Sequence, residues 1–112
     1  MADQIEFADF QKVDMRIGRI TLAEDFPKAR KPSYRLTIDF GPLGTRRSVA
    51  ALKTDYRLED LPGRQVVCVF NFSPRRIAGF DSEVLVLGAT EADGTLRLLT
   101  PDPGAELGSY VS

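Results

Sequence analysis

The architecture of this chain follows from the stretch Val13-Asp14-Met15-Arg16-Ile17-Gly18-Arg19-Ile20-Thr21-Leu22. Its apolar and polar side chains alternate as far as Ile17, and after Gly18 the apolar phase shifts to Ile20 and Leu22. Alternation is typical of a half-buried strand. A shift of phase at a glycine indicates a β-bulge in a strongly bent strand. The stretch therefore predicts a long first strand, bulged at Gly18, that curves around a small barrel or sandwich.

Further short strands, separated by turn signals, are predicted downstream. Tyr34 to Phe40 alternates most regularly, and Gly41-Pro42-Leu43-Gly44 turns it into a partner strand from Thr45 to Leu52. Thr54 to Leu61 is long enough for a helical turn or two before Pro62-Gly63. Val66 to Phe72 is almost wholly apolar, which predicts a central strand.

The second half continues the same pattern. We expect a basic loop from Ser73 to Asp81, a buried strand from Val84 to Ala89, and a hairpin at Asp93-Gly94. The tail, Pro101 to Ser112, is rich in proline and glycine and is expected to wrap over the surface. At the start of the chain, the spacing of Ile5, Phe7 and Phe10 predicts one short amphipathic helix.

Five or more strands, a bulged first strand and a helix between the third and fourth predict a mainly β fold. The all-β architecture with this order is the five-stranded OB-fold barrel. We expect one domain over residues 1–112, with the barrel at about 12–100, a short N-terminal helix and flanking extensions.

Composition predicts a soluble globular protein of the cytoplasm. The chain is 43% hydrophobic and 28% charged, and no apolar run approaches the ~20 residues that a membrane-spanning helix needs. Its first residues lack the basic and apolar regions of a secretory signal. The single cysteine, Cys68, excludes an internal disulfide and fits a reducing compartment.

Charge is distributed unevenly along the chain, although the net charge is only -1. The segment from Pro27 to Phe80 holds eleven basic and four acidic residues, a net charge of +7 that the two ends balance with -8. Two interpretations stay open. The basic middle either presents a positive face to an anionic partner or consists of scattered, solvated charges.

The sequence carries no set of residues that predicts catalysis. Histidine is absent, which removes the commonest general base and metal ligand, and one cysteine cannot form a zinc site. Cys68 lies in the apolar run Val66 to Phe70, as expected of an inert core residue. Glu83 is interpreted as a strand-end charge first and a ligand contact second. We therefore expect no enzyme activity, no metal and no cofactor.

Two segments are candidates for binding. Lys28 to Arg35 is basic and has Phe26 and Tyr34 at its ends, a mixture that suits phosphates and stacked bases. The alternative is a solvated connection whose aromatic side chains fold inward. The second segment, Asn71 to Ser82, carries Arg75-Arg76 on a proline-containing loop, and arginine suits bidentate contact with phosphate or carboxylate. The alternative is that one arginine pairs with an acidic neighbour, Asp81 or Glu83.

Several motifs in order resemble one known family. The stretch Asn71-Phe72-Ser73-Pro74-Arg75-Arg76-Ile77-Ala78-Gly79-Phe80-Asp81-Ser82-Glu83-Val84-Leu85-Val86-Leu87-Gly88 is similar to the signature of the tRNA-binding-domain family. Phe10 to Ile20 resembles the first strand of that family. Phe26 to Tyr34 and Ile38 to Gly41 resemble its CsaA-type export chaperones in particular. The resemblance extends from about Phe7 to about Pro103.

The resemblance implies an OB-fold, a homodimer and a binding function. The first expectation is a chaperone for unfolded or precursor polypeptides in protein export, and the alternative is binding of structured RNA such as tRNA. The implied peptide- or RNA-binding residues are Lys31, Arg75, Arg76 and Ser82, with Asn71 and Glu83 shaping the same loop. Ser82 equally suits capping of the turn before the next strand. One departure is Ser48-Val49-Ala50, where CsaA-type members carry Ser-Ser-Ala.

Apolar residues on both flanks of the barrel predict the dimer contact. A small barrel fills its interior with its own strands, so apolar flanks need another surface. They either fold over the barrel ends or, as the resemblance to CsaA-type proteins implies, pair two copies symmetrically. The flanking candidates are Ile5, Phe7, Phe10, Leu107 and Tyr110.

Overall fold

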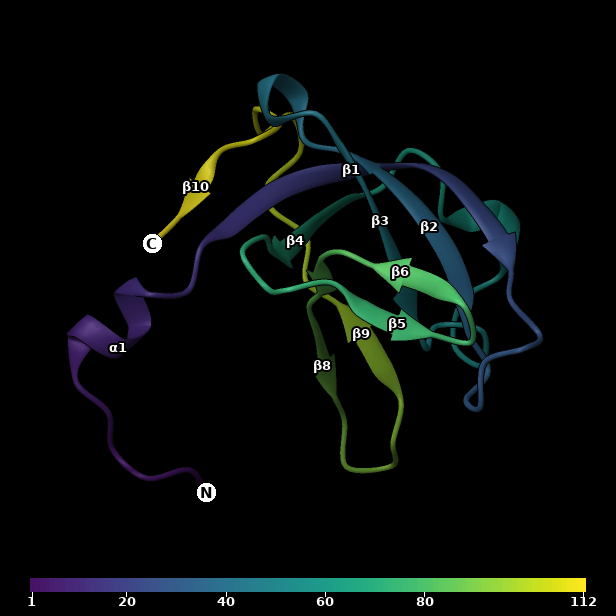
Figure 1. Ribbon diagram of the computed structural model, residues 1–112, viewed down its shortest axis with the longest axis horizontal. Helices are drawn as coiled ribbons and strands as arrows, with labels where there is room; N and C mark the ends of the chain where they lie inside the picture. Colours follow the sequence, from purple (N-terminus) through teal and green to yellow (C-terminus); the bar gives the residue numbers. More distant parts are fainter.

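The computed structural model describes residues 1–112, and a curved sheet around the long strand β1 (Met15–Asp25) dominates it (Figure 1). β1 pairs antiparallel with β2 (Tyr34–Asp39) along its second half and with β4 (Gln65–Val69) along its first. The order of the sheet is β3-β2-β1-β4-β7, and β10 (Tyr110–Val111) joins the part of β1 that β2 leaves free. The tail therefore wraps back onto the barrel as expected.

The remaining elements are short. The predicted N-terminal helix is confirmed as α1 (Phe7–Gln11), and single 3₁₀ turns η1 (Gly41–Leu43) and η2 (Leu58–Asp60) follow β2 and β3. The other strands are β3 (Thr45–Ala50), β5 (Arg75–Ile77), β6 (Phe80–Ser82), β7 (Leu85–Val86), β8 (Gly88–Thr90) and β9 (Leu96–Leu98).

The bulge in β1 exists, but its predicted position at Gly18 is wrong. Pairing with β2 shifts register between Ile20 and Leu22, so Thr21 is the inserted residue. Gly18 stays in register with β4, and its lack of a side chain serves packing instead. A Cβ at Gly18 would lie 2.5 Å from Cγ2 of Ile38, a distance that no real Cβ contact shows. The role of Gly18 is therefore to let β1 pack closely against Ile38 in the core, and the bulge lies elsewhere in the strand.

The barrel closes between β3 and the residues just before β7. The Ser48 hydroxyl donates a hydrogen bond to the carbonyl oxygen of Val84 at 2.8 Å. The backbone N–H of Glu83 donates to the carbonyl oxygen of Arg47, also at 2.8 Å. The prediction of a mainly β, OB-type barrel with one short N-terminal helix is confirmed.

The core fills the inside of this barrel. β2 contributes alternate residues, as its sequence pattern predicts, and β4 contributes Val66 and Cys68. Its fully buried side chains are Ile20, Leu36, Ile38, Phe40, Leu52, Leu61, Val66 and Cys68. Because the barrel is filled, a ligand has to bind on its outside.

Four predicted segments differ in detail. The loop expected from Ser73 to Asp81 is in part a two-stranded hairpin, β5–β6, because Ala78 and Gly79 both adopt positive φ angles (48° and 84°). Two such residues form the type I′ turn that matches strand twist. The strand expected from Val84 to Ala89 divides at Leu87, where pairing with β4 ends and pairing of β8 with β9 begins. The central strand ends at Val69, and Thr54 to Leu61 holds one 3₁₀ turn.

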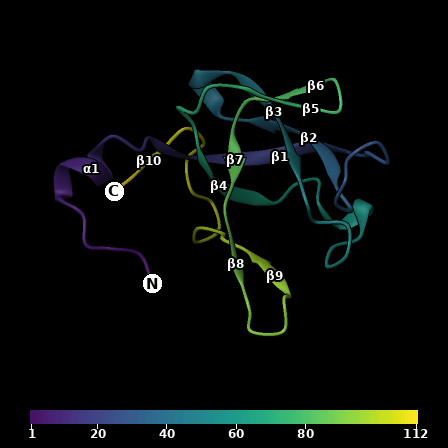
Figure 2. The ribbon, with the colours of Figure 1, turned by 60° about the horizontal axis from the view of Figure 1, so that its bottom comes forward.

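The hairpin β8–β9 and the N-terminal segment both project from the barrel (Figure 2). The hairpin turns at Asp93-Gly94, which confirms that prediction. No helix in the structure has the length and apolarity needed to cross a membrane.

Candidate ligand-binding groove

A groove of about 840 Å³ lies beside the C-terminal end of β3. Four parts of the chain line it: the loop after β1, the end of β3, the strand β5 with its turn, and β7 to β9. Twelve of the 19 lining residues are hydrophobic, five are basic and none is acidic. The groove therefore combines an apolar floor with a purely cationic rim.

The floor combines one outward-facing residue of β7 with residues that also pack against the core. Val84 is buried in the barrel, and its neighbour Leu85 points outward with 38% of its surface exposed. Leu96 and Leu98 of β9 and Val49 of β3 complete the floor. An exposed leucine inside a hollow marks apolar surface that a ligand can cover.

The rim brings together basic residues that are distant in the sequence. Lys28, Arg30 and Lys31 come from the loop between β1 and β2, and Arg75 and Arg76 come from β5. Arg76 donates a hydrogen bond to Asp81 at 2.9 Å, which confirms that one of the two arginines pairs with an acidic neighbour. The other four basic residues form no ion pair. Their charge is available to an anionic ligand.

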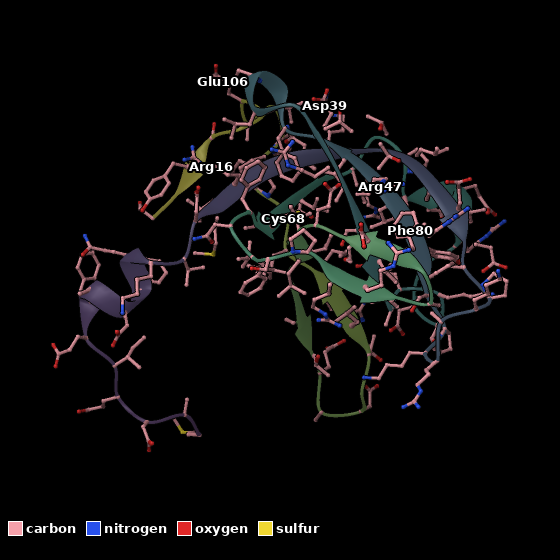
Figure 3. All side chains as sticks on the ribbon, in the orientation of Figure 1. Arg16, Asp39, Arg47, Cys68, Phe80 and Glu106 are labelled. Atoms are coloured by element: carbon pink, nitrogen blue, oxygen red, sulfur yellow. The ribbon has the colours of Figure 1, made fainter.

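The hairpin that carries the arginines is held to the barrel by Phe80. Its ring packs against Phe26 with the centroids 5.8 Å apart. The guanidinium groups of Arg47 and Arg35 lie 4.5 and 5.3 Å from the centroid of the same ring, and Figure 3 shows Arg47 beside Phe80. Cation–π contacts of this kind fix an element that hardly pairs with the main sheet. Phe80 thus positions one wall of the groove.

Three of the predicted site residues hold the backbone in place. The side chain of Asn71 accepts from the N–H of Asp14 at 3.0 Å and donates to the carbonyl of Lys12 at 2.7 Å. Ser82 Oγ accepts from the N–H of Val49 at 3.0 Å. Glu83 Oε1 accepts from a backbone N–H of β3 at 2.8 Å. Ser82 thus bonds to β3 instead of capping the turn before β7, and Glu83, interpreted as a strand-end charge, bonds to the same strand.

The structure separates the other predicted residues into two groups. Lys31, Arg75 and Arg76, the basic residues that the resemblance singles out, all line the groove. Tyr34 and Phe26 are buried, which favours the interpretation that the aromatic side chains of this segment fold inward. They are therefore not available for stacking with bases.

The flanking apolar residues lie away from the groove. Ile5 and Phe7 are 69% and 71% exposed, and Phe7 packs only loosely on Phe10, with ring centroids 6.1 Å apart. Tyr110 is 54% exposed and lies under the guanidinium of Arg16. Figure 1 shows α1 set apart from the barrel. Leu107 is half-buried where the tail crosses the barrel end.

Cys68 lies inside the barrel (Figure 3). Burial raises the pKa of its thiol to about 12, because the thiolate loses its hydration there. The thiol is therefore protonated at neutral pH and cannot act as a nucleophile. No group of three or more His, Cys, Asp or Glu side chains is placed to hold a metal ion.

Sequence reasoning missed the floor of the groove and part of its rim. Leu85 lies in an unbroken apolar run, so no alternation distinguishes it from its buried neighbours. Lys28 and Arg30 belong to the basic segment that the sequence singles out, although only Lys31 was assigned to the site. Lys28 and Arg30 could have been assigned as well, because the loop from Pro27 to Ser33 contains basic residues and no acidic one.

The fold and the groove define a small binding domain of the barrel type, and comparison with known proteins identifies its family. Residues 15–110 match the family described as putative tRNA binding domain. The chain belongs to this family. Curated relatives include methionine–tRNA ligase of Porphyromonas gingivalis, 40% identical over 111 residues, which are 99% of this chain and 16% of that protein. The chain thus spans about a sixth of the length of these relatives.

Within the family, the chain is of the CsaA type. The structure of the chaperone CsaA from Bacillus anthracis is 47% identical, with a TM-score of 0.92 over 98% of this chain and 100% of that one. The CsaA chaperone protein from Picrophilus torridus is 44% identical, with a TM-score of 0.91 over 97% and 100% of the two chains.

Proposed function

We propose that the chain binds unfolded or precursor polypeptides in the groove and acts as a chaperone, without catalysis, in protein export. The observation that carries the proposal is the apolar floor around Leu85 beside a rim with four unpaired cations. The likeness to two CsaA chaperones supports it. We place this function in the cytoplasm.

The floor suits side chains of a chain that has not folded. Such a segment exposes apolar groups, and covering them on the floor removes apolar surface from water. Completing the burial of Leu85, which is 38% exposed, contributes roughly 0.6–1.1 kcal/mol, given about 1.5–3 kcal/mol for a whole leucine side chain. The contact is nonspecific, so many client sequences fit.

Suppression of client aggregation tests the proposal. Light scattering of a heat-denatured client should stay low in the presence of the protein, and Leu85→Asp should weaken peptide binding by at least about threefold. Leu22→Asp is the matched control, because Leu22 is 49% exposed on β1 and does not line the groove. An absence of suppression, together with an absence of peptide binding, would show the proposal wrong.

A second candidate function is binding of tRNA, favoured by the family match and by the cationic rim. Phosphate contacts release counterions, so log K should fall with log salt at about -0.7 to -0.9 per phosphate. Filter binding with bulk tRNA measures this slope. Arg75→Ala should flatten it by roughly one unit per lost contact, whereas Arg57→Ala, outside the groove and paired with Glu59, should not. No binding at low salt would eliminate this candidate.

We also propose that two copies pair through the flanks of the barrel. The exposed Ile5, Phe7 and Tyr110, with Phe10 and Leu107, supply apolar surface that this chain alone leaves uncovered. Sedimentation equilibrium should give twice the chain mass of 12.4 kDa. Combined Phe7→Ser and Phe10→Ser should give the single mass, while Phe72→Ser, exposed but off the flanks, should not. A wild-type mass of one chain would refute the pairing.

A further inference from the structure

The edge of β3 that borders the groove carries unpaired backbone groups. The pairing of β2 with β3 turns the N–H and C=O of Val49 away from β2. The N–H donates to Ser82 Oγ, and no strand pairs with β3 on this side. Two residues further on, just past the end of β3, the N–H of Ala51 makes no hydrogen bond. Both residues line the groove, so a short length of open strand edge faces a bound ligand.

We propose that the groove takes an extended, acidic polypeptide segment as an added strand on this edge. The inference rests on the proposed polypeptide-binding function and names how the segment is recognised. A backbone N–H of the segment donates to the Val49 carbonyl, and a backbone carbonyl accepts from the Ala51 N–H. Strand addition satisfies groups that every polypeptide has, which gives affinity without reading sequence.

The charge of the lining determines which segments fit. In an extended segment, successive side chains point to opposite sides, so one set lies on the apolar floor and the other points outward. Lys28, Arg30, Lys31 and Arg75 surround the groove without acidic partners, and no acidic residue lines it. Segments in which apolar residues alternate with glutamate or aspartate therefore complement both surfaces, and segments with lysine in those places are repelled.

Ala51→Pro tests the protein side of this pairing. Proline removes the N–H of residue 51, and the structure loses no internal hydrogen bond because that N–H makes none. The preceding Ala50 is already in strand conformation, as a residue before proline requires. Binding of a labelled peptide of alternating valine and glutamate should weaken roughly three- to tenfold. Ala51→Ser keeps the N–H and should bind like wild type, and thermal melts check that both variants fold.

N-methylation of the peptide tests the ligand side without altering the protein. Moving one N-methyl group along the backbone should weaken binding at alternate positions only, because alternate N–H groups face the β3 edge. The counterpart peptide, with lysine in place of glutamate, should bind at least about tenfold more weakly. Fluorescence anisotropy measures both, at low and at high salt.

The outcomes separate this inference from the function on which it rests. Strand addition is supported if N-methylation weakens peptide binding at alternate positions only, and if Ala51→Pro weakens peptide binding while Ala51→Ser does not. Equal binding of all N-methylated peptides, or of the glutamate and lysine peptides, overturns the inference while polypeptide binding stands. If neither peptide binds and client aggregation is not suppressed, the proposed function itself fails. Binding of tRNA with no peptide binding also overturns the inference.

Discussion

Phe80→Ala should release the hairpin β5–β6 from the barrel while leaving the barrel folded. The hairpin pairs within itself, and its turn residue Ala78 lies in the strained left-handed region. A two-stranded hairpin alone is marginally stable in water. One hydrogen bond, from the N–H of Val49 to Ser82 Oγ, ties the base of the hairpin to β3. Beyond that base, its position depends on the ring of Phe80, which contacts Phe26, Arg35 and Arg47.

The size of the effect follows from those three contacts. The aromatic pair contributes about 0.5–1.5 kcal/mol, and each arginine over the ring contributes about 0.5–1 kcal/mol at an exposed site. Their sum, about 1.5–3.5 kcal/mol, is the free energy by which opening of the hairpin becomes easier. At about 1.4 kcal/mol per tenfold change, the opening equilibrium rises roughly ten- to several-hundredfold.

Hydrogen exchange measured by NMR distinguishes local opening from global destabilisation. The paired amides of β5 and β6 should exchange faster by that factor, while amides of β1 and β2 change much less. Phe72→Ala is the control, because Phe72 is half exposed near the hairpin and makes no aromatic or cation–π contact. Unchanged hairpin exchange, or equal acceleration in hairpin and barrel, would refute the role given to Phe80.

Three further predictions concern stability. Gly18→Ala should destabilise the fold by about 1–3 kcal/mol in urea titrations, because the new Cβ meets Ile38 and Phe40, both fully buried. Ala78→Asn should slow exchange in the hairpin, since asparagine tolerates the positive φ; the gain is about 0.5–1 kcal/mol. Because burial raises the pKa of Cys68 from 9.0 to about 12, its contribution to stability is complete below pH 9. It is lost as pH rises toward 12, by up to about 1.4 kcal/mol per pH unit. Denaturation of Cys68→Ala at matched pH values should lack that loss.

The barrel could be predicted because its strands carry a local pattern. Tyr34 to Asp39 alternates in sequence and in burial, and the β8–β9 hairpin turns at Asp93-Gly94 as expected, with Gly94 at a positive φ of 92°. The bulge could not be placed, because a glycine in a strand signals either a bend or a close approach, and here the approach to Ile38 required it. The β5–β6 hairpin was missed because Ala78 is an unusual residue for a left-handed turn position.

The groove could be predicted only in part, since it depends on long-range contacts. The basic segments at Lys31 and Arg75 stand out in the sequence, and the structure joins them at one rim. Leu85 gives no local signal, because whether a residue of an apolar run faces the core or the groove depends on the position of the barrel wall. Among the polar residues of the family motif, Asn71 is expected to shape the loop, and in the structure its side chain is bonded to the backbone of Asp14 and Lys12.

The way in which the barrel closes explains why its binding surface lies beside β3. Glu83 and Ser82 occupy the edge of β3 at Arg47 and Val49, and beyond that point the edge is left open. A barrel closed along its whole length would offer no backbone to a ligand, and an open edge without protection would pair with another copy. Here the basic rim surrounds the open edge. The basic rims of two copies would repel each other, whereas an acidic extended chain would be attracted. In the proposed binding mode, incomplete closure of the barrel thus creates a site for a ligand strand without favouring edge-to-edge pairing of two copies.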